Sequence, residues 1–432
     1  MKMFLLIFML IVEGATAQTG ESLLRGLAIY GGSSEGNFPV VVRKKVDENG
    51  VSLGASTAIT IQFDILAETV PDLKIRFSHC NRNWVVDDNL FVNDKNHNTS
   101  FYLDYKTSPG GVKGYSYRFT NSFPDRDDAV RFEYSGNWIF SILDKKETVV
   151  FATGRFFVVD ELRPTTVRVS NDYLTANTSP YNQIHKIVVQ VKLADEIDGA
   201  RYTMVDIYQN LKIYNPYRID MWDKDSYTFV EGQNTGERIF KISSILPGND
   251  YRVWDIGNLT RYPNWIPVRN SNGPDQLRVF WRTGPDHNGE AIRNQFTGIN
   301  SDYLDVLFRL DMTASNFRSV TSGGKEIFLV GEFNFWNPMK DDALAYNDTE
   351  RLYVVKKFLP RGVYDYQYIT GTWDATKQQV VNQDWVAIEG NDWRTTNTYT
   401  AMVYYSDPRF GGFDRIVGMA HASSVQELPG SN

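Results

Sequence analysis

Residues 186–193 read KIVVQVKL, and every second side chain from Ile187 to Leu193 is apolar. Successive residues of an extended chain point to opposite sides, so these apolar side chains share one face. The same period of two recurs in YSYRFTNSF at 115–123 and in VYDYQYI at 363–369. This alternation predicts β-strands that are buried on one face.

Turn sequences separate the alternating segments. Examples are SPGG at 108–111, LPGND at 246–250 and LPRG at 359–362. The chain of 432 residues is 42% apolar and 14% aromatic, and the aromatic content favours strands. Little helical periodicity is present. The sequence therefore predicts an all-β protein made of tandem immunoglobulin-like or early-set β-sandwich domains.

Two polar, proline-containing segments suggest where one domain ends and the next begins. DELRPTT at 160–166 follows a long apolar run, and RTGPDHNGEAIRNQFTGIN at 282–300 is long enough to be a linker. We therefore expect an N-terminal sandwich over 22–158, a middle sandwich over 160–290 and a C-terminal sandwich over 300–420.

The first 17 residues have the pattern of a secretory signal peptide. Lys2 precedes an apolar run from Met3 to Val12, and Ala15-Thr16-Ala17 forms an A-x-A cleavage site. We expect residues 1–17 to be removed on export. No later run is long and apolar enough to predict a membrane-spanning helix, so we expect no direct membrane span.

The composition and motifs favour a binding protein over an enzyme. The net charge is −7 and no basic stripe is present, so we expect no nucleic-acid partner. GSSEG at 32–36 matches a nucleophile elbow, but a strand-like segment follows it where a helix is needed. The five histidines lack metal-binding spacing. We expect no catalytic residue, no metal and no cofactor.

Cys80 is the only cysteine and lies in RFSHCNRNW at 76–84. A thiolate nucleophile activated by His79 is one interpretation. Adjacent residues of a strand point to opposite faces, which opposes a side-chain hydrogen bond between the two. The alternative is a small buried thiol at the end of a strand, with Trp84 over the edge of the core. We favour the buried thiol and a monomeric chain.

The segment 327–373 resembles the starch- and glycogen-binding early-set modules. The matching positions are Gly331, Phe333, Asn334, Trp336, Pro360, Gly362 and Trp373. In those modules two tryptophans stack on sugar rings and a lysine assists. The resemblance makes Trp336 and Trp373 candidates for a surface sugar platform, while Gln367 stands near the lysine position. A fold retained for docking to another protein is the other interpretation.

Ordered motifs across the chain resemble the plug protein of the type IX secretion system of the Bacteroidetes. They include FSHCNRNW, YSYRFTNSFP, FEYSGNWIFSI and GRFFVVDE in the first predicted domain, YQNLKI and GNDYRVWDI in the second, and VGEFNFW and RFGGFDRIVG in the third. The likeness runs from about residue 24 to residue 418.

The resemblance implies a function without an active site. A plug binds the periplasmic mouth of the outer-membrane β-barrel translocon and closes it, so we expect a periplasmic protein attached to the outer membrane through protein contacts. In this interpretation the segment around Cys80 determines the fold and contributes at most a rim contact. The alternative function is a periplasmic glycan-binding module or an accessory protein of a glycosidase.

Overall fold

The computed structural model describes residues 23–43, 57–94, 97–125, 129–161, 163–175, 182–193, 199–223, 225–232, 236–264, 266–278, 284, 286–313 and 322–424. The predicted signal peptide at 1–17 lies outside these residues. The described chain consists of strands joined by turns and short 3-10 helices, so the prediction of an all-β fold is confirmed. The 3-10 helices are η2 (Gly199–Arg201), η3 (Gly298–Ser301), η4 (Ser322–Gly324), η5 (Glu332–Asn334), η6 (Lys340–Asp342) and η7 (Arg409–Gly411).

Two sheets built from the first part of the chain pack face to face. One has the order β1 (Leu23–Gly31), β3 (Ile59–Leu66), β7 (Tyr117–Phe123), β6 (Tyr105–Thr107). The other has the order β2 (Val40–Arg43), β9 (Val150–Asp160), β8 (Gly136–Asp144), β4 (Leu73–Cys80), β5 (Thr99–Ser100). Alternate side chains of both sheets, such as Phe63 and Phe140, form one buried core. We call this unit the first sandwich.

The second sandwich contains the last two strands of the described part of the chain. One sheet has the order β10 (Thr165–Tyr173), β11 (Gln183–Lys192), β15 (Glu237–Ile245), β14 (Thr228–Glu231). The other has the order β13 (Tyr217–Asp220), β12 (Met204–Gln209), β26 (Thr398–Asp407), β27 (Phe413–Ser423). Ile187 and Val189 of β11 pack against Val205 and Val403 of the facing sheet, as the alternation at 186–193 predicts.

The third sandwich lies in the chain between β15 and β26. One sheet joins β16 (Arg252–Asp255), β24 (Val363–Asp374) and β19 (Ala291–Ile292), with β21 (Glu326–Gly331) and β25 (Gln379–Asp384) also paired to β24. The other joins β17 (Val268–Arg269), β20 (Tyr303–Asp311), β23 (Leu352–Pro360) and β22 (Ala345–Asn347), with β18 (Asp275–Gln276) paired to β20. The two sheets enclose one core.

Two of the strand pairings cross the predicted domain boundaries. Strand β26 falls within the predicted domain 300–420, yet it pairs with β12, placing Val205 opposite Val403. Conversely, β16 falls within the predicted domain 160–290 but pairs with β24, placing Trp254 opposite Tyr364. The middle sandwich is therefore discontinuous in sequence, and the third is inserted into it. Division of the chain into independently folding domains remains a proposal.

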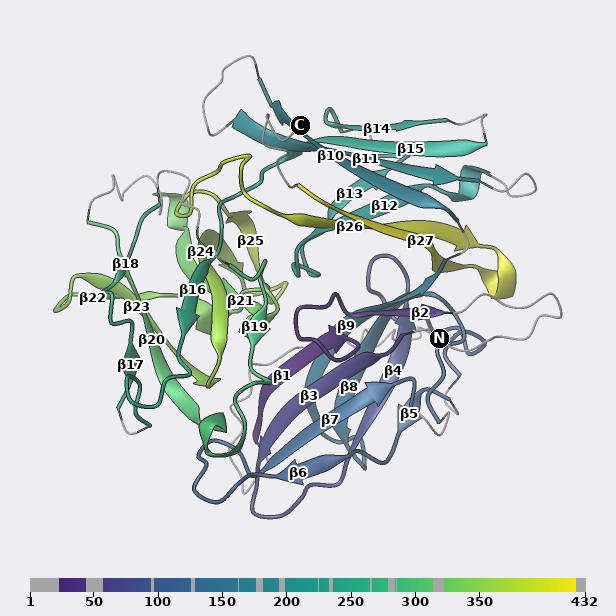
Figure 1. The fold of residues 1–432 in the computed structure, drawn as a ribbon. Helices are drawn as coiled ribbons and strands as arrows, with labels where there is room; N and C mark the ends of the chain where they lie inside the picture. Colours follow the sequence, from purple (N-terminus) through teal and green to yellow (C-terminus); the bar gives the residue numbers. More distant parts are fainter. Residues whose placement is uncertain are drawn as a thin grey trace, which may run out of the picture.

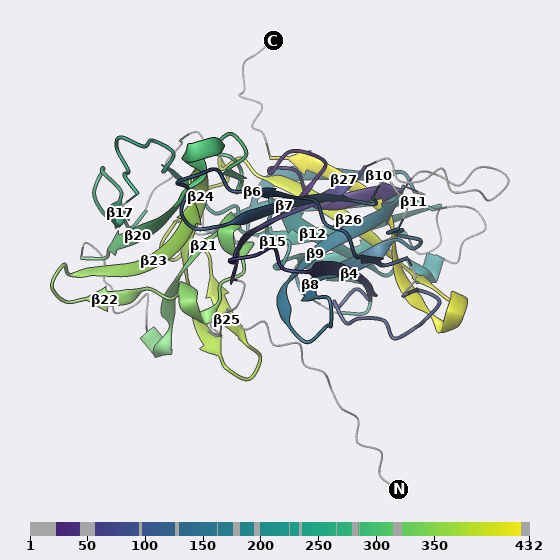
Figure 2. The ribbon, with the colours of Figure 1, turned by 90° about the horizontal axis from the view of Figure 1, so that it is seen from below.

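Buried contacts join the three sandwiches into one flattened body (Figures 1 and 2). The first and second share an apolar core that includes Phe157, Tyr208 and Met402. Between the first and third, Arg293 donates to Glu35 at 3.0 Å and to Glu332 at 2.8 Å. These contacts bury side chains that would otherwise face water, so the relative positions of the sandwiches are part of the fold.

Candidate docking surface

The chain that follows β4 is held by buried polar side chains. His79 is fully buried, with Nδ1 2.6 Å from an Asp87 carboxylate oxygen and Nε2 3.0 Å from the Ser135 carbonyl oxygen. The Asn93 side chain accepts from the His79 backbone N–H at 2.6 Å and donates to the Asp87 carbonyl at 2.5 Å. This network fixes the course of residues 81–94 over the end of the first sandwich.

Cys80 is next to this network and is buried, so the prediction of a buried thiol is confirmed. Its sulfur lies 3.7 Å from the Ser78 carbonyl oxygen. Burial raises the pKa of the Cys80 thiol to about 12, and the nearby Asp87 carboxylate acts in the same direction. A thiol with this pKa holds its proton at neutral pH and is a poor nucleophile.

Gly136, the first residue of β8, allows the first and second sandwiches to approach closely. Its φ is +145°, and a Cβ there would lie 2.3 Å from Nε2 of His79 and 2.8 Å from the Asp414 carbonyl oxygen. Side chains cannot come that close to each other. The residue is thus needed where β27 passes over the buried histidine.

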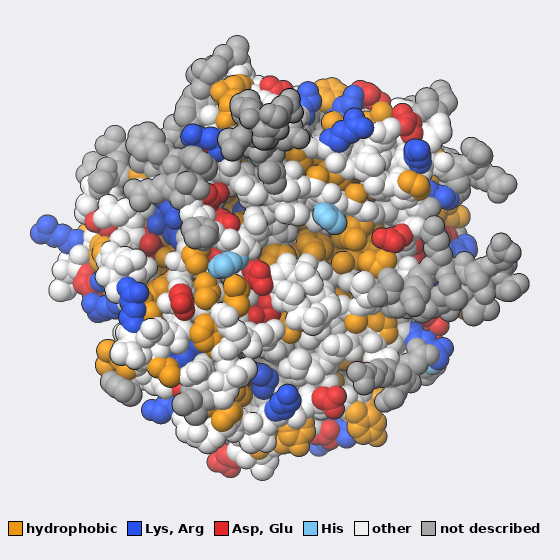
Figure 3. Space-filling model, viewed as in Figure 1, with side chains coloured by type: hydrophobic (Ala, Val, Ile, Leu, Met, Phe, Trp, Pro, Cys, Tyr) orange, Lys and Arg blue, Asp and Glu red, His pale blue; other side chains and the backbone are white. Residues whose placement is uncertain are grey.

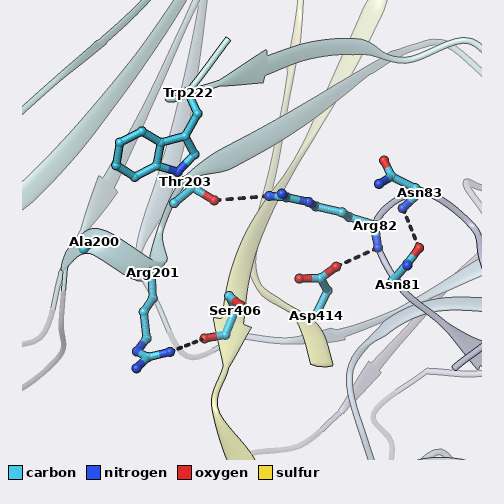
Figure 4. A pocket seen from close by; sticks show the side chains of 9 residues that line it. All are labelled: Asn81, Arg82, Asn83, Ala200, Arg201, Thr203, Trp222, Ser406 and Asp414. Atoms are coloured by element: carbon cyan, nitrogen blue, oxygen red, sulfur yellow. Dashed lines mark hydrogen bonds between the residues drawn. The ribbon is translucent and has the colours of Figure 1, made fainter. Parts of the chain in front are cut away.

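A cavity of about 530 Å³ lies between these two sandwiches (Figure 4). It is lined by Asn81, Arg82, Asn83, Ala200, Arg201, Thr203, Trp222, Ser406 and Asp414. The Arg82 backbone N–H donates to the Asp414 carboxylate at 2.9 Å, and its guanidinium donates to the Thr203 hydroxyl at 3.2 Å. Trp222 is 70% exposed at the cavity mouth. The cavity thus combines a guanidinium with an accessible aromatic ring.

Arg218 connects the loop after β4 to the second sandwich. Its guanidinium donates to both oxygens of the buried Asp206 at 2.9 and 3.0 Å, to the Asn83 side chain at 2.7 Å and to the Arg82 carbonyl at 2.9 Å. Burial raises the pKa of the Asp206 carboxyl, while Arg218 acts to lower it. This pairing holds the two sides of the cavity together.

Large apolar side chains are exposed on the loop after β4 and on the turn between β26 and β27. Phe91 is 69% exposed and Phe410 is 44% exposed, and their rings stack with centroids 5.4 Å apart. The Asn89 side chain donates to the Phe410 carbonyl at 2.6 Å. Val85 and Leu90, on the same loop, are also exposed. We call the stacked pair Phe91 and Phe410 the aromatic patch. Exposed apolar groups that cluster in this way are typical of protein interaction sites.

The view in Figure 3 shows how side chains are distributed over one face of the molecule. Hydrophobic side chains reach the surface along the junction between the upper and lower sandwiches, and charged side chains are scattered over the rest of the face.

The predicted sugar-platform residues lie in the third sandwich, Trp336 shortly after η5 and Trp373 on β24. Trp336 is only 1% exposed, and its indole N–H donates to the Gly289 carbonyl at 3.0 Å. The description of Trp336 as a surface residue is therefore wrong, because the turn that carries it folds under the loop at 286–290. Trp373 is half-buried and packs in the same apolar cluster. The two rings share a cluster but do not form an exposed platform.

Comparison with known families finds a similarity in the first sandwich. Residues 39–160 match the model of the type 9 secretion system plug protein 1st domain. The matched range covers β2 to β9 and includes the loop after β4. The resemblance of the third sandwich to starch-binding modules stays a prediction. No curated protein matches the sequence.

Among solved structures, a hypothetical protein from Parabacteroides merdae has the same fold. Its TM-score is 0.71, the alignment covers 93% of this chain and 97% of that one, and the two are 17% identical. At this identity the likeness shows the arrangement of the three sandwiches and nothing of function. A marsupial T cell receptor covers 82% of this chain at 9% identity, but its TM-score of 0.16 carries no argument.

Sequence reasoning missed the aromatic patch and the cavity. A signal for the patch was present in VVDDNLF at 85–91, where apolar residues flank two aspartates and an asparagine without strand alternation.

Within the described ranges, no group of three His, Cys, Asp or Glu side chains is placed to hold a metal ion. No helix in the described part of the chain has the length and hydropathy to cross a bilayer.

Proposed function

We propose that this chain is a plug of the type IX secretion system, which binds the periplasmic opening of the outer-membrane translocon barrel and seals it. The observation that carries the proposal is the match of residues 39–160 to the plug-protein domain. In this account the chain is exported to the periplasm, is monomeric before it binds, and reaches the outer membrane through contacts with the barrel.

The form of the molecule supports sealing. The three sandwiches lie side by side in a flattened body, and their junctions contain buried ion pairs such as Arg293 with Glu35. In a protein that closes a pore wide enough for folded proteins, the three sandwiches must stay together when force acts on them. Buried contacts between sandwiches resist such separation because parting them would expose apolar surface and unpaired charge.

The aromatic patch supplies the contact in this proposal. Aromatic and arginine side chains contribute most of the binding energy in many interfaces. Phe91 and Phe410 offer exposed rings, and Arg82 and Trp222 line the cavity between the same two sandwiches. The loop after β4 and the turn between β26 and β27 thus present anchors from two sandwiches on one surface.

The test is co-purification of the tagged, full-length chain with the translocon from outer membranes. We expect the wild-type chain to retain the barrel through washing, and the double variant Phe91→Asp, Phe410→Asp to lose it. Phe229→Asp is a matched control, because Phe229 is also exposed but lies on β14 of the outer sheet of the second sandwich. Absence of the barrel from the wild-type sample, with the barrel present in the membranes, would contradict the proposal.

The glycan-binding alternative receives no support from the tryptophans. A sugar platform needs ring faces open to solvent, and Trp336 is buried. Micromolar binding of a maltooligosaccharide to the intact chain would nevertheless restore this alternative, since it would show a platform built from other residues.

A further inference from the structure

A second cavity, of about 450 Å³, lies between the second and third sandwiches. Its walls come from the segment after β12, the connection between β15 and β16, and the chain that follows β25. The residues that line it include Lys212, Asn215, Tyr251, Lys325, Gln367 and Trp385. This volume falls within the range of small-molecule sites, and junctions between domains are common places for such sites.

Lys212 is the unusual group in this cavity. Its side chain is largely buried, with 8% of the residue exposed, and it lines the cavity. The ammonium nitrogen lies 4.3 Å from the ring centre of Trp385, 5.4 Å from that of Tyr251 and 5.6 Å from that of Trp336. In the part of the chain that the structure describes, no side chain forms an ion pair or hydrogen bond with this ammonium.

A buried charge without a partner is costly, so such groups are usually paired. Aromatic faces compensate only in part, since a cation–π contact contributes about 0.5–2 kcal/mol. Burial lowers the pKa of Lys212 to about 7, and the Coulomb attraction of Glu389 acts in the opposite direction. The side of the Lys212 ammonium that faces the cavity can therefore bind an anion from solution.

The rest of the lining offers acceptors beside this cation. The Gln367 amide donates to the Asn249 carbonyl at 3.1 Å, and the Asn215 amide donates to the Trp336 carbonyl at 3.3 Å. Among the described residues, the side-chain oxygens of Gln367 and Asn215 receive no hydrogen bond. They can accept from hydroxyl groups of a ligand. The cavity thus combines one anion-binding group with hydroxyl-binding groups.

We propose that this cavity binds a small hydroxylated carboxylate, such as a sugar acid. Its carboxylate pairs with Lys212, and its hydroxyls donate to Asn215 and Gln367. The rings of Tyr251 and Trp385 cover the apolar side of the ligand. The site lies between the second and third sandwiches, is separate from the aromatic patch, and does not depend on the plug role.

Binding is expected to depend on pH, because the ligand needs the protonated amine. The other titratable groups near Lys212 are Tyr251, Tyr217, Lys325 and Asp384 along the cavity and the buried Glu389 behind it. The carboxylate of Asp384 accepts from the backbone N–H groups of residues 386 and 387 at 3.1 and 3.0 Å. As pH rises above about 7, the Lys212 ammonium of the ligand-free protein loses its proton. The affinity for the carboxylate ligand therefore falls by up to about tenfold per pH unit.

The experiment is isothermal titration calorimetry on the full chain lacking residues 1–17, with D-glucuronate, D-glucose and acetate as probes at pH 6.5 and pH 8.5. We expect glucuronate to bind at least tenfold more tightly than glucose or acetate, and at least tenfold more tightly at the lower pH. A peptide ending in a free carboxylate, such as trialanine, distinguishes a peptide terminus from a sugar acid. Tighter binding of trialanine than of glucuronate would overturn the proposal.

The variant Lys212→Met keeps the apolar length of the side chain and removes the charge. It should abolish glucuronate binding while the chain stays folded, since the buried charge is lost. The control Lys241→Met removes a half-buried lysine on β15 that does not line the cavity, and it should bind as the wild type does. Equal binding of glucose and glucuronate, unchanged binding by Lys212→Met, or no heat with any probe would each contradict the proposal.

Discussion

Phe91 of the first sandwich and Phe410 of the second stack on each other with ring centroids 5.4 Å apart and an interplanar angle of 16°, although both side chains are exposed. Two exposed rings gain little stability from a contact that water still surrounds. Their position on two different sandwiches means that a partner covering them would also bridge the junction. This is the geometry expected of a docking anchor.

The first prediction separates docking from folding at this patch. The double variant Phe91→Ala, Phe410→Ala should change the free energy of unfolding by no more than about 1 kcal/mol, because the side chains removed are largely exposed. The amount of translocon that co-purifies with the tagged chain should fall at least tenfold, as expected when side chains that contribute most of the binding energy are removed. Urea unfolding and quantitative co-purification measure the two effects. A variant that loses stability but keeps the barrel would mean that the patch is structural.

The second prediction concerns the ion cluster between the first and third sandwiches. Replacement of Arg293 with Met leaves the buried carboxylates of Glu35 and Glu332 without their cation. The cost in unfolding free energy should be about 3–5 kcal/mol. The control is Lys241→Met. The pair of Lys241 with Glu231 is exposed, so its loss should lower the unfolding free energy by less than about 1 kcal/mol. Equal midpoints of urea unfolding for the two variants would refute the importance of this cluster.

A third prediction concerns Cys80. The native protein should react slowly with a thiol reagent, because the sulfur is buried and burial raises the pKa of the thiol to about 12. Replacement with Ala removes little volume and should cost about 1–2 kcal/mol. Rapid labelling before unfolding, or a covalent dimer that a reductant separates, would show that the thiol is accessible.

A fourth prediction follows from Asp365, which is fully buried on β24. One carboxylate oxygen accepts from the backbone N–H groups of His287 and Gly289 at 2.8 and 2.9 Å, while the other has no hydrogen-bond partner among the described residues. Burial raises the pKa of this carboxyl from 3.8 to about 7, and the two backbone hydrogen bonds act in the opposite direction.

Because the folded-state pKa of Asp365 is raised, its contribution to stability is greatest below about pH 4 and is lost as pH rises to about 7. The variant Asp365→Asn keeps the acceptor for both N–H groups and does not titrate. Relative to the wild type, its unfolding free energy should therefore increase between pH 4 and pH 7 and then level off. A constant difference over this range, measured by urea unfolding, would show that the carboxyl does not titrate there.

Local alternation in the sequence was enough to predict individual strands, because it records which face of a strand is apolar. Tyr364, Tyr366 and Tyr368 alternate along β24 and all enter the core of the third sandwich. Their neighbours Asp365 and Gln367 read as the solvent-facing side, yet they are also buried. They are covered by segments distant in sequence, and no local pattern can show that covering.

The same reason explains what the sequence could not show about the site. Pairing of β26 with β12 brings residues near 400 beside residues near 205, and this long-range contact places Asp414 at the cavity. Trp336 matched a surface-aromatic motif, but its burial depends on the loop around Gly289. The motif around Cys80 was predicted to determine the fold. The contacts of His79 agree with that role, whereas the exposed side chains that follow were not singled out.

The most direct test of the plug function measures whether the chain closes a pore in cells. Entry of a large antibiotic that the outer membrane normally excludes is compared in four strains, namely wild type, plug deletion, barrel deletion and the double deletion. We predict that sensitivity rises in the plug deletion and returns to the level of the barrel deletion in the double mutant. Unchanged sensitivity in the plug deletion, with the barrel shown to be present in the outer membrane, would contradict the account.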